Sequence, residues 1–314
     1  MPLLANYEEL LACPACRGRL KPAETGFECR DCIRNYRRVG PPPGWPVLID
    51  DSKSVVDTHQ VQHGGGSSQI KRLGEGTRLA WVHRLVTPQN STAESYVRRL
   101  VADLRSQGVT RPRILVVGGG AIGSGIEELY VDPSVDIVAF DIYGSPRVQL
   151  VADGHQIPLR DACVDGVVVQ AVLEHVLEPT LVVAEIHRVL RANGLVYADT
   201  PFLQHVHEGP FDFTRFTESG HRYLFRDFEA VESGAVAGLG TALLWSIDAF
   251  LHGLTRGRLL SRLVRVALFW LSRLDARCDP RVTVDGASSV FFYGRRSTSR
   301  MTPAEVIAHY QGSQ

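Results

Sequence analysis

Short apolar runs alternate with helical patterns through the C-terminal three quarters of the chain. Five runs rich in β-branched residues have the length of buried strands, and they span 114–117, 137–140, 148–152, 166–169 and 195–198. A helical pattern at 181–190 lies between the last two. Continuously apolar strands that alternate with helices indicate a parallel sheet covered on both faces. The pattern therefore predicts a doubly wound, mostly parallel α/β sheet, in which functional side chains follow the strands.

The segments before and after these strands suggest the domain boundaries. Apolar residues at helical spacing predict a helix over 92–107 that opens the α/β domain: Tyr96, Val97, Leu100, Val101 and Leu104. Residues 1–50 form a separate small module, and the Gly- and Ser-containing stretch 51–90 is typical of a linker. We expect the α/β domain to occupy 91–314, with a helical insertion at about 240–277 and a last strand at 290–293.

The small N-terminal module carries paired cysteines. Cys13 and Cys16 form one C-x-x-C knuckle, and Cys29 and Cys32 form a second one twelve residues later. Each knuckle can present two thiolates to one tetrahedral zinc ion, so the spacing predicts a closed, structural metal site. The stretch 11–51 resembles the zinc-ribbon family typified by the tRNA-methyltransferase activator protein, which is also found fused to bacterial methyltransferases.

Composition narrows the functional classes. Basic and acidic residues number 34 each, so the chain has no overall electrostatic footprint for nucleic acid. The N-terminus lacks the basic and apolar regions of an export signal, which predicts a cytoplasmic protein. In that compartment the six cysteines are better explained as metal ligands and buried thiols than as disulfides.

A glycine-rich turn follows the first predicted strand. Gly118, Gly119 and Gly120 come directly after the strand, and we expect a helix to begin behind them. Asp141 ends the second strand about twenty residues later, where it can accept hydrogen bonds from ribose hydroxyls. Alone, this pattern suits NAD as well as other nucleoside cofactors. Turn formation is the alternative explanation for Asp141.

Three further segments give the glycine turn a more specific meaning. They are Asp153-Gly154-His155-Gln156-Ile157-Pro158-Leu159-Arg160-Asp161, Val164-Asp165-Gly166-Val167-Val168 and Val172-Leu173-Glu174-His175-Val176. In this order they resemble the class I S-adenosylmethionine-dependent methyltransferases, over about 114–225. The resemblance implies a Rossmann-like methyltransferase fold and S-adenosylmethionine as cofactor.

The same resemblance implies a role for each matching residue. Gly118 and Gly120 would contact the methionine part of the cofactor, Asp141 its ribose and Asp153 its adenine. The full set of cofactor-binding residues would be Gly118, Gly119, Gly120, Asp141, Asp153, Gly154, His155 and Gln170. The sequence departs from the family pattern at Val116 and Ile122. For Glu174 and His175, packing at the start of a helix is an equal alternative.

A polar and aromatic loop follows the fifth strand. His207 is our first candidate for the base that accepts the acceptor's proton. Asp212 could orient it or act as the base, and Arg215 could hold an anionic or hydroxyl-rich substrate. A structural ion pair between Asp212 and Arg215 is the alternative. The H-x-x-P-x-D-x-x-R-F-T arrangement resembles methyltransferases of polysaccharide and natural-product biosynthesis, which implies an oxygen of a sugar or another small intermediate as acceptor.

A basic amphipathic segment lies near the C-terminus. Between 256 and 275, five apolar residues share one helical face, and arginines lie beside them. We favour a helix that covers the sheet or meets a second copy of the chain. Peripheral contact with the inner membrane surface is the alternative.

Two other functions fit parts of the pattern. An NAD-dependent sugar dehydrogenase or epimerase would use the same glycine turn and Asp141, but Lys21, Lys53 and Lys71 all precede that turn. The α/β domain therefore has no Tyr-x-x-x-Lys pair of the common short-chain type. A non-catalytic scaffold with a partner-binding zinc ribbon is the third possibility, suggested by Val116 and Ile122.

Overall fold

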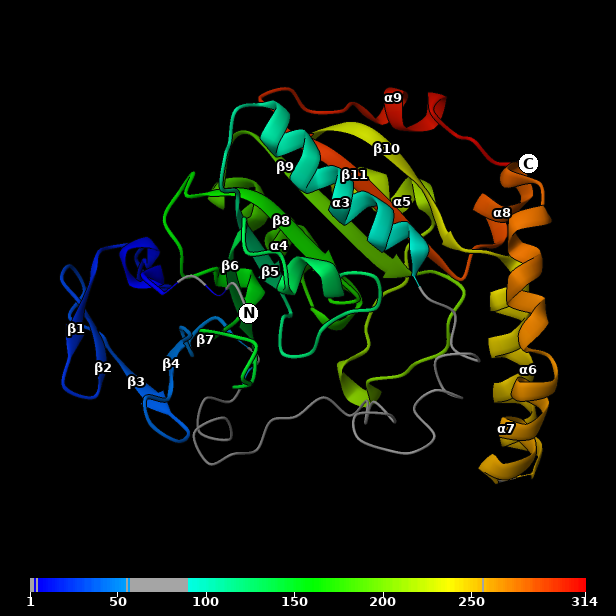
Figure 1. Ribbon diagram of the computed structural model, residues 1–314, viewed down its shortest axis with the longest axis horizontal. Helices are drawn as coiled ribbons and strands as arrows, with labels where there is room; N and C mark the ends of the chain where they lie inside the picture. The colour runs from blue at the N-terminus through cyan, green and yellow to red at the C-terminus, as the bar shows by residue number, and fades with distance from the viewer. Residues whose placement is uncertain (1–2, 4, 55, 57–89, 256) are drawn as a thin grey trace.

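The computed structural model describes residues 3, 5–54, 56, 90–255 and 257–314 (Figure 1). Most of the expected linker at 51–90 lies outside these residues. Eleven strands form one sheet in the order β1-β2-β3-β4-β7-β6-β5-β8-β9-β11-β10. The predicted α/β fold with a mostly parallel core is confirmed.

Five parallel strands form the centre of the sheet: β7 (Leu150–Ala152), β6 (Asp136–Asp141), β5 (Arg113–Val117), β8 (Val164–Gln170) and β9 (Leu190–Pro201). The antiparallel strands β11 (Ser289–Arg296) and β10 (Phe228–Ala237) follow them on one side. The chain runs outward from β5 through β6 to β7 and then returns to β8 on the other side of β5. Strand order therefore reverses between β5 and β8, where such sheets bind ligands.

Apolar side chains on both faces hold the sheet between helices. Along β5, Ile114 and Val116 belong to the core beneath α3 (Ser91–Ser106), whereas Leu115 and Val117 belong to the opposite core. That second core includes Val182 and other residues of α4 (Pro179–Val189), and Leu224 of α5 (Glu218–Leu224). Because successive residues of a strand point to opposite faces, two covered faces require the continuously apolar strands seen in the sequence.

The N-terminal module extends this sheet rather than standing apart from it. After the 3₁₀ helix η1 (Tyr7–Leu10), the strands β1 (Leu20–Ala23), β2 (Gly26–Cys29), β3 (Asn35–Val39) and β4 (Trp45–Leu48) pair antiparallel in sequence. Strand β4 then pairs in parallel with β7. The Trp45 indole N–H also donates to the carbonyl of Val148 at 3.1 Å. The cysteine-bearing module is thus anchored to one edge of the α/β domain.

The helix expected behind the glycine turn is absent, and that prediction is wrong. Residues 121–126 are irregular, and only the short 3₁₀ helix η2 (Glu127–Tyr130) follows. Gly125 has a φ of +88°, and a Cβ atom there would lie 2.2 Å from the carbonyl oxygen of Asn90. Glycine is also unfavourable inside a helix, so the Gly-Ser-Gly run at 123–125 favours a tight loop against the start of α3.

The helical insertion forms a hairpin at one end of the molecule (Figure 1). Helix α6 (Leu239–Thr255) packs against α7 (Arg258–Ala267) and the 3₁₀ segment η6 (Phe269–Arg277). It precedes α8 (Pro280–Gly286), and α9 (Pro303–Ala308) lies near the C-terminus. Among the described residues, α7 and η6 pack on α6 rather than on the sheet, so the sheet-covering half of the expectation for 256–275 is wrong, and the contact with a second copy stays a prediction. Within the described chain, no helix combines the length and apolarity needed to cross a bilayer.

Candidate cofactor and acceptor site

The glycine turn lies at the carboxyl ends of the parallel strands. Gly118 has a φ of +74°, and a Cβ atom there would lie 2.3 Å from a methyl carbon of Val172. The backbone N–H of Gly120 donates to Asp141 Oδ2 at 2.8 Å. Glycine is therefore required at Gly118, and Asp141 holds the turn close to the end of β6.

Asp141 can still accept ligand hydrogen bonds. The N–H of Ile142 binds its Oδ1 at 2.7 Å, and the N–H of Gly120 binds the other oxygen. The backbone of Tyr143 is a third donor, and because a carboxylate has about four acceptor positions, about one remains for a ribose hydroxyl. Burial raises the pKa of Asp141 to about 6, although hydrogen bonds from the backbone lower it. The carboxylate therefore gains its charge near neutrality.

Asp153, Gly154 and His155 form a turn directly after β7. Asp153 is buried and caps the short helix η3 (Gly154–Gln156), where its Oδ1 accepts from the His155 backbone at 2.9 Å. The His155 ring contacts the same oxygen at 2.6 Å, and its Nε2 accepts from the N–H of Glu178 at 3.2 Å. Ser54 donates to the other oxygen of Asp153. His155 thus contacts Asp153 through Nδ1 and the backbone of Glu178 through Nε2.

Gln170 connects the glycine turn to the fifth parallel strand. Its Nε2 donates to the carbonyl of Ser124 at 3.1 Å and to Asp199 Oδ2 at 3.0 Å. The same Asp199 oxygen accepts from the hydroxyl of Tyr197 at 2.9 Å and from the amide of Asn90 at 3.1 Å. Burial raises the pKa of Asp199 to about 6 despite these donors.

Sequence reasoning missed Asp199 and Asn90. Asp199 lies within an apolar strand, and Asn90 caps a helix that is 109 residues earlier in the chain. An aspartate in a strand otherwise buried on both faces was the available signal, because a buried charge requires partners.

Asp212 and Arg215 form a closed structural pair in the loop behind β9. The guanidinium donates to both Asp212 oxygens and to three backbone carbonyls, those of Gln204, His205 and Thr214. All five of its N–H donors are therefore engaged. Burial raises the pKa of Asp212, but the hydrogen bonds from Arg215 hold it below its usual range. The arrangement supports the ion-pair alternative and leaves Arg215 no free donor for a substrate.

The same loop brings His207 against His175. The Nε2 atoms of the two rings lie 3.2 Å apart, and the rings meet edge to face. His175 belongs to η4 (Leu173–His175), the short 3₁₀ helix behind β8. The backbone N–H of His207 donates to Asp212 Oδ2 at 2.9 Å, so the Asp212–Arg215 pair fixes the position of His207. The histidine partner of His207 could not be recognised from spacing, because 32 residues separate the two.

Glu174 is the third member of this group and lies near both histidine rings. Its Oε1 lies 3.5 Å from His175 Nε2 and 3.8 Å from His207 Nε2. The side chain is fully buried, and neither carboxyl oxygen has a hydrogen-bond partner among the described residues. Burial raises the pKa of Glu174 to about 8. An unpartnered buried carboxyl group of this kind is uncommon and points to a ligand.

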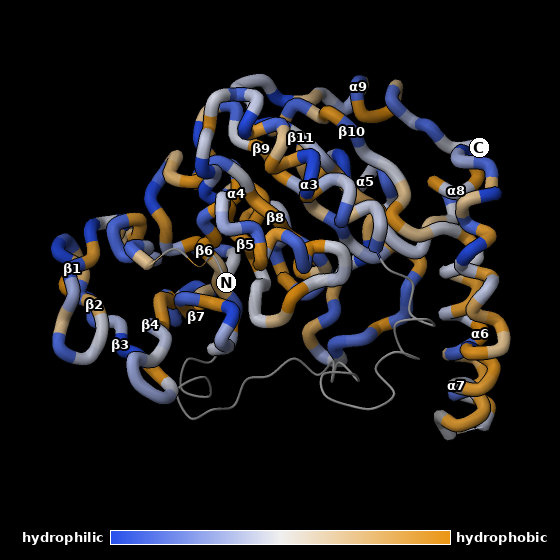
Figure 2. The backbone as a smooth tube through the Cα atoms, in the orientation of Figure 1, coloured by the Kyte–Doolittle hydropathy of each residue, from blue (hydrophilic) through white to orange (hydrophobic). Residues whose placement is uncertain are grey.

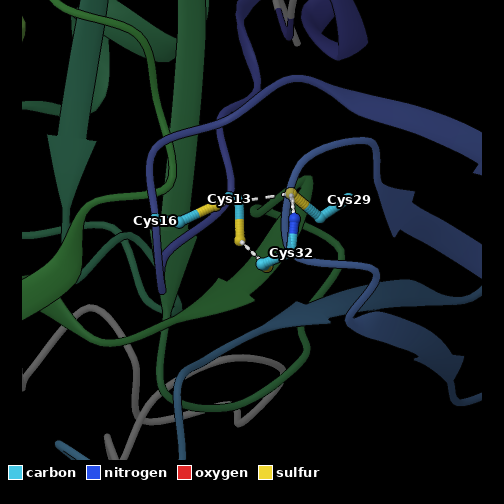
Figure 3. A group of neighbouring side chains, drawn as sticks. All are labelled: Cys13, Cys16, Cys29 and Cys32. Atoms are coloured by element: carbon cyan, nitrogen blue, oxygen red, sulfur yellow. Dashed lines mark hydrogen bonds between the residues drawn. The ribbon is translucent and has the colours of Figure 1, made fainter.

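The four predicted cysteine ligands converge in the N-terminal module (Figure 3). Their sulfur atoms all lie within 4.8 Å of one another, with Cys13 and Cys32 3.6 Å apart and Cys16 and Cys29 3.5 Å apart. Four thiolates around one zinc ion lie about 3.8 Å apart, given a zinc–sulfur bond of about 2.3 Å. Burial raises the pKa of Cys29, but backbone N–H groups lower it to about 7. The cluster therefore fits a tetrahedral metal.

Comparison with protein families identifies the centre of the α/β domain. Residues 121–198 match the family model described as "Methyltransferase domain". The match begins directly after Gly120 and runs to the fifth parallel strand, and so includes Gln170, Glu174 and His175. A search of curated proteins returns no match.

Several solved structures are similar to the chain at low identity. A methyltransferase dependent on S-adenosylmethionine from Archaeoglobus fulgidus has 12% identity and a TM-score of 0.42, over 70% of this chain and all of that one. A complex between the Trm112 methyltransferase activator of Haloferax volcanii and a methyltransferase has 18% identity and a TM-score of 0.41. The likeness covers 66% of this chain and 93% of that one. The [4+2]-cyclase SpnF has 16% identity and a TM-score of 0.41, over 64% of this chain and 82% of that one. Neither an acceptor nor a partner for this chain follows from likenesses at these scores.

The family match, the strand order and the glycine turn agree on the class of this domain. The α/β part of the chain has a Rossmann-like methyltransferase fold, and its residues 121–198 match a methyltransferase domain.

Proposed function

We propose that the chain transfers a methyl group from S-adenosylmethionine to an oxygen of a small hydroxylated acceptor, such as a sugar. The observation that carries this proposal is the meeting of two groups at one sheet edge. The glycine turn with Asp141 ends β5 and β6, and the histidine pair lies behind β8 and β9. A nucleoside site beside a pair of imidazoles suits methyl transfer to a protonated nucleophile.

Each group has a role in this proposal. Gly118, Gly119 and Gly120 admit the methionine part, Asp141 accepts from the ribose, and Asp153 with its turn binds the adenine. The bound cofactor supplies an electrophilic methyl group. His207 Nδ1 lies 3.3 Å from the carbonyl of His205, so a hydrogen there leaves a lone pair on Nε2. That lone pair can accept the proton of the acceptor hydroxyl as the new carbon–oxygen bond forms.

Cofactor binding tests the proposal most directly. Calorimetry on one preparation should show binding of S-adenosylmethionine and its demethylated product, and no binding of NAD. Binding of NAD alone would favour the dehydrogenase alternative. Absence of both would favour the scaffold. With the cofactor established, methyl transfer from labelled S-adenosylmethionine to a panel of sugars and sugar nucleotides identifies the acceptor.

We propose that the cysteine cluster holds one structural zinc ion. Cys13 and Cys29 are buried, and strand β4 ties the module to β7 beside Asp153. A closed four-thiolate site offers no open position to a substrate. The ion would therefore stabilise the edge of the sheet next to the adenine-binding turn.

We also propose peripheral contact between the α6–α7 hairpin and an anionic membrane surface. Large apolar residues on both helices are exposed, Phe250, Leu254 and Leu259 among them, and Figure 2 shows the hydrophobic positions along the hairpin. Residues 239–277 contain six arginines and two aspartates, in a chain with no net charge overall. Apolar area beside excess positive charge suits such a surface.

Vesicle sedimentation tests the hairpin. The wild-type protein should sediment with vesicles of anionic phosphatidylglycerol and not with vesicles of neutral phosphatidylcholine. The double variant Phe250→Asp/Leu254→Asp should lose the interaction. Light scattering distinguishes the other occupant of this face, because a homo-oligomer that the same variant dissociates would replace the membrane proposal.

A further inference from the structure

We propose that Glu174, His175 and His207 form a second metal site, which binds a divalent transition-metal ion at the acceptor side of the methyltransferase domain. The site uses three ligands and lies apart from the cysteine cluster. Its role in catalysis rests on the proposed methyl transfer to oxygen, whereas the binding of the ion does not.

The three candidate ligand atoms have the spacing of a coordination sphere. His175 Nε2, His207 Nε2 and Glu174 Oε1 are separated by 3.2, 3.5 and 3.8 Å. The point equidistant from all three lies about 2.0 Å from each atom, which matches the bonds of about 2.0–2.2 Å from zinc to nitrogen and oxygen. An ion can therefore reach all three atoms without a rearrangement of the backbone.

Hydrogen bonding orients both imidazoles for coordination. His175 Nδ1 lies 2.7 Å from the carbonyl oxygen of Phe211, and His207 Nδ1 lies 3.3 Å from that of His205. A carbonyl only accepts, so a hydrogen on each Nδ1 would satisfy it, and in that tautomer each Nε2 presents a lone pair. A second shell of this kind is typical of metal-binding histidines.

Apart from one another, the three ligand atoms have no hydrogen-bond partner among the described residues. Two lone pairs face each other across 3.2 Å, and the adjacent carboxylate of Glu174 is fully buried without a hydrogen-bond partner among the described residues. With both Nε2 atoms unprotonated and Glu174 ionised, three acceptors converge and repel one another, and either a shared proton or a cation can relieve this repulsion. A bound cation would remove the repulsion and satisfy all three at once.

The ligand types indicate the class of ion and its chemistry. Two imidazoles and one carboxylate form a set used by zinc and by other first-row divalent ions, and it leaves positions open for a substrate. An acceptor hydroxyl in such a position has a lowered pKa and loses its proton to solvent. The oxygen then attacks the methyl group, the methyl–sulfur bond breaks, and sulfur keeps the electron pair. In this form His207 acts as a ligand, and the ion takes over the activation of the hydroxyl.

Metal content provides the test. The full-length protein is incubated with excess Mn²⁺ and desalted, and zinc and manganese are counted together by elemental analysis. We expect two ions per chain in the wild type, since manganese does not displace zinc from four thiolates. Glu174→Gln and His207→Ala should each retain one ion. Glu178→Gln is the matched control, because this exposed residue lies four positions away, and it should retain two.

Three results would overturn the site: a wild-type protein that lacks the second ion after loading, variants that keep it, or a control that loses it. Electron paramagnetic resonance of bound Mn²⁺ gives an independent readout in the same samples. Calorimetry with S-adenosylmethionine separates this proposal from the methyltransferase proposal. Failure of cofactor binding with two ions present contradicts only the function, whereas normal cofactor binding with one ion contradicts only the site.

Discussion

The cysteine cluster and the Glu174–His175–His207 group differ in how the fold assembles them. The cysteines come from two knuckles twelve residues apart, and local hairpins bring them together. The second group joins a short helix behind β8 to a loop behind β9, 32 residues later. Sequence spacing reveals the first kind of site. The second appears only when parallel strands end at the same edge, because topology rather than spacing creates it.

The largest expected effect concerns the cysteine cluster. Cys29→Ser should remove about one zinc ion per chain and lower the melting temperature markedly, since structural zinc binding contributes about 10–16 kcal/mol in small zinc modules. Because β4 pairs with β7 next to Asp153, affinity for S-adenosylmethionine should fall as well. Elemental analysis, calorimetry and thermal unfolding measure these three effects.

Cys278→Ser is the matched control for this change, because Cys278 lies far from the cluster, on the C-terminal side of η6. Unchanged zinc content in Cys29→Ser would remove the cysteine cluster as a metal site. The contrast with the second group would then lose its first member.

The second prediction concerns turnover. His207→Ala should slow methyl transfer by about 10²–10⁴-fold, since we propose that this residue activates the acceptor hydroxyl either as a base or as a metal ligand. Affinity for S-adenosylmethionine should change little, because His207 lies behind β9 and not in the glycine turn. Single-turnover rates with the identified acceptor measure the first effect and calorimetry the second.

His205→Ala is the matched control for His207→Ala, because it changes the same loop but keeps the His207 side chain. The exposed His205 contributes only its backbone carbonyl to the contacts with Arg215 and His207, and alanine retains that carbonyl. A His207→Ala variant no slower than His205→Ala would limit His207 to packing of the loop.

Much of the fold follows from the sequence, and the exceptions have physical reasons. Uninterrupted β-branched runs predicted the five parallel strands, because strands buried on both faces tolerate few polar residues. A helix was predicted behind the glycine turn and is absent, since the motif does not show how tightly Gly125 packs on Asn90. The pairing of β4 with β7 joins segments about a hundred residues apart, and no local pattern encodes it.

The candidate site was less predictable than the fold. Family resemblance indicated Asp141, Gln170 and the glycines, which the structure places along one edge. It did not reveal that all the N–H donors of Arg215 bind acceptors within its own loop. Nor did it reveal that Asp199 accepts a hydrogen bond from Gln170. Those facts depend on side-chain hydrogen bonds between distant segments, which a single sequence does not specify.

The third prediction concerns the cofactor side of the sheet edge. Asp141→Ala should weaken binding of S-adenosylmethionine by roughly 10- to 150-fold, equivalent to about 1.5–3 kcal/mol for a charged hydrogen bond. Gly118 is a poorer probe, because its φ of +74° and the nearby Val172 penalise any side chain. Asp161→Ala is the control, since this exposed carboxylate lies before β8, at the opposite edge of the sheet.

The pKa of Asp141 adds a pH dependence to this prediction. Burial raises it to about 6, and only the ionised form is a full acceptor for ribose hydroxyls. Affinity should therefore fall about fivefold as the pH drops from 6 to 5 and about tenfold for each unit below that, since each unit well below the pKa costs about 1.4 kcal/mol. Asp141→Asn should abolish this dependence of the affinity on pH, because asparagine does not ionise. Identical profiles in both proteins would place the ribose elsewhere.

The last prediction has the smallest expected effect and concerns His221, a buried histidine without a hydrogen-bond partner for its ring among the described residues. His221 is buried between Phe216 and Phe225, and neither ring nitrogen has a hydrogen-bond partner among the described residues. Burial lowers its pKa to about 3, whereas an unfolded histidine titrates near 6.5. Below pH 6.5 the unfolded chain therefore binds a proton that the folded chain excludes, and folding loses stability as the pH falls. The loss should approach about 1.4 kcal/mol per pH unit. His221→Phe should flatten this slope in denaturant titrations at pH 5 and 7, whereas the exposed control His309→Phe should leave it unchanged. Equal slopes in the wild type and His221→Phe would mean that the folded chain protonates His221 as readily as the unfolded chain does.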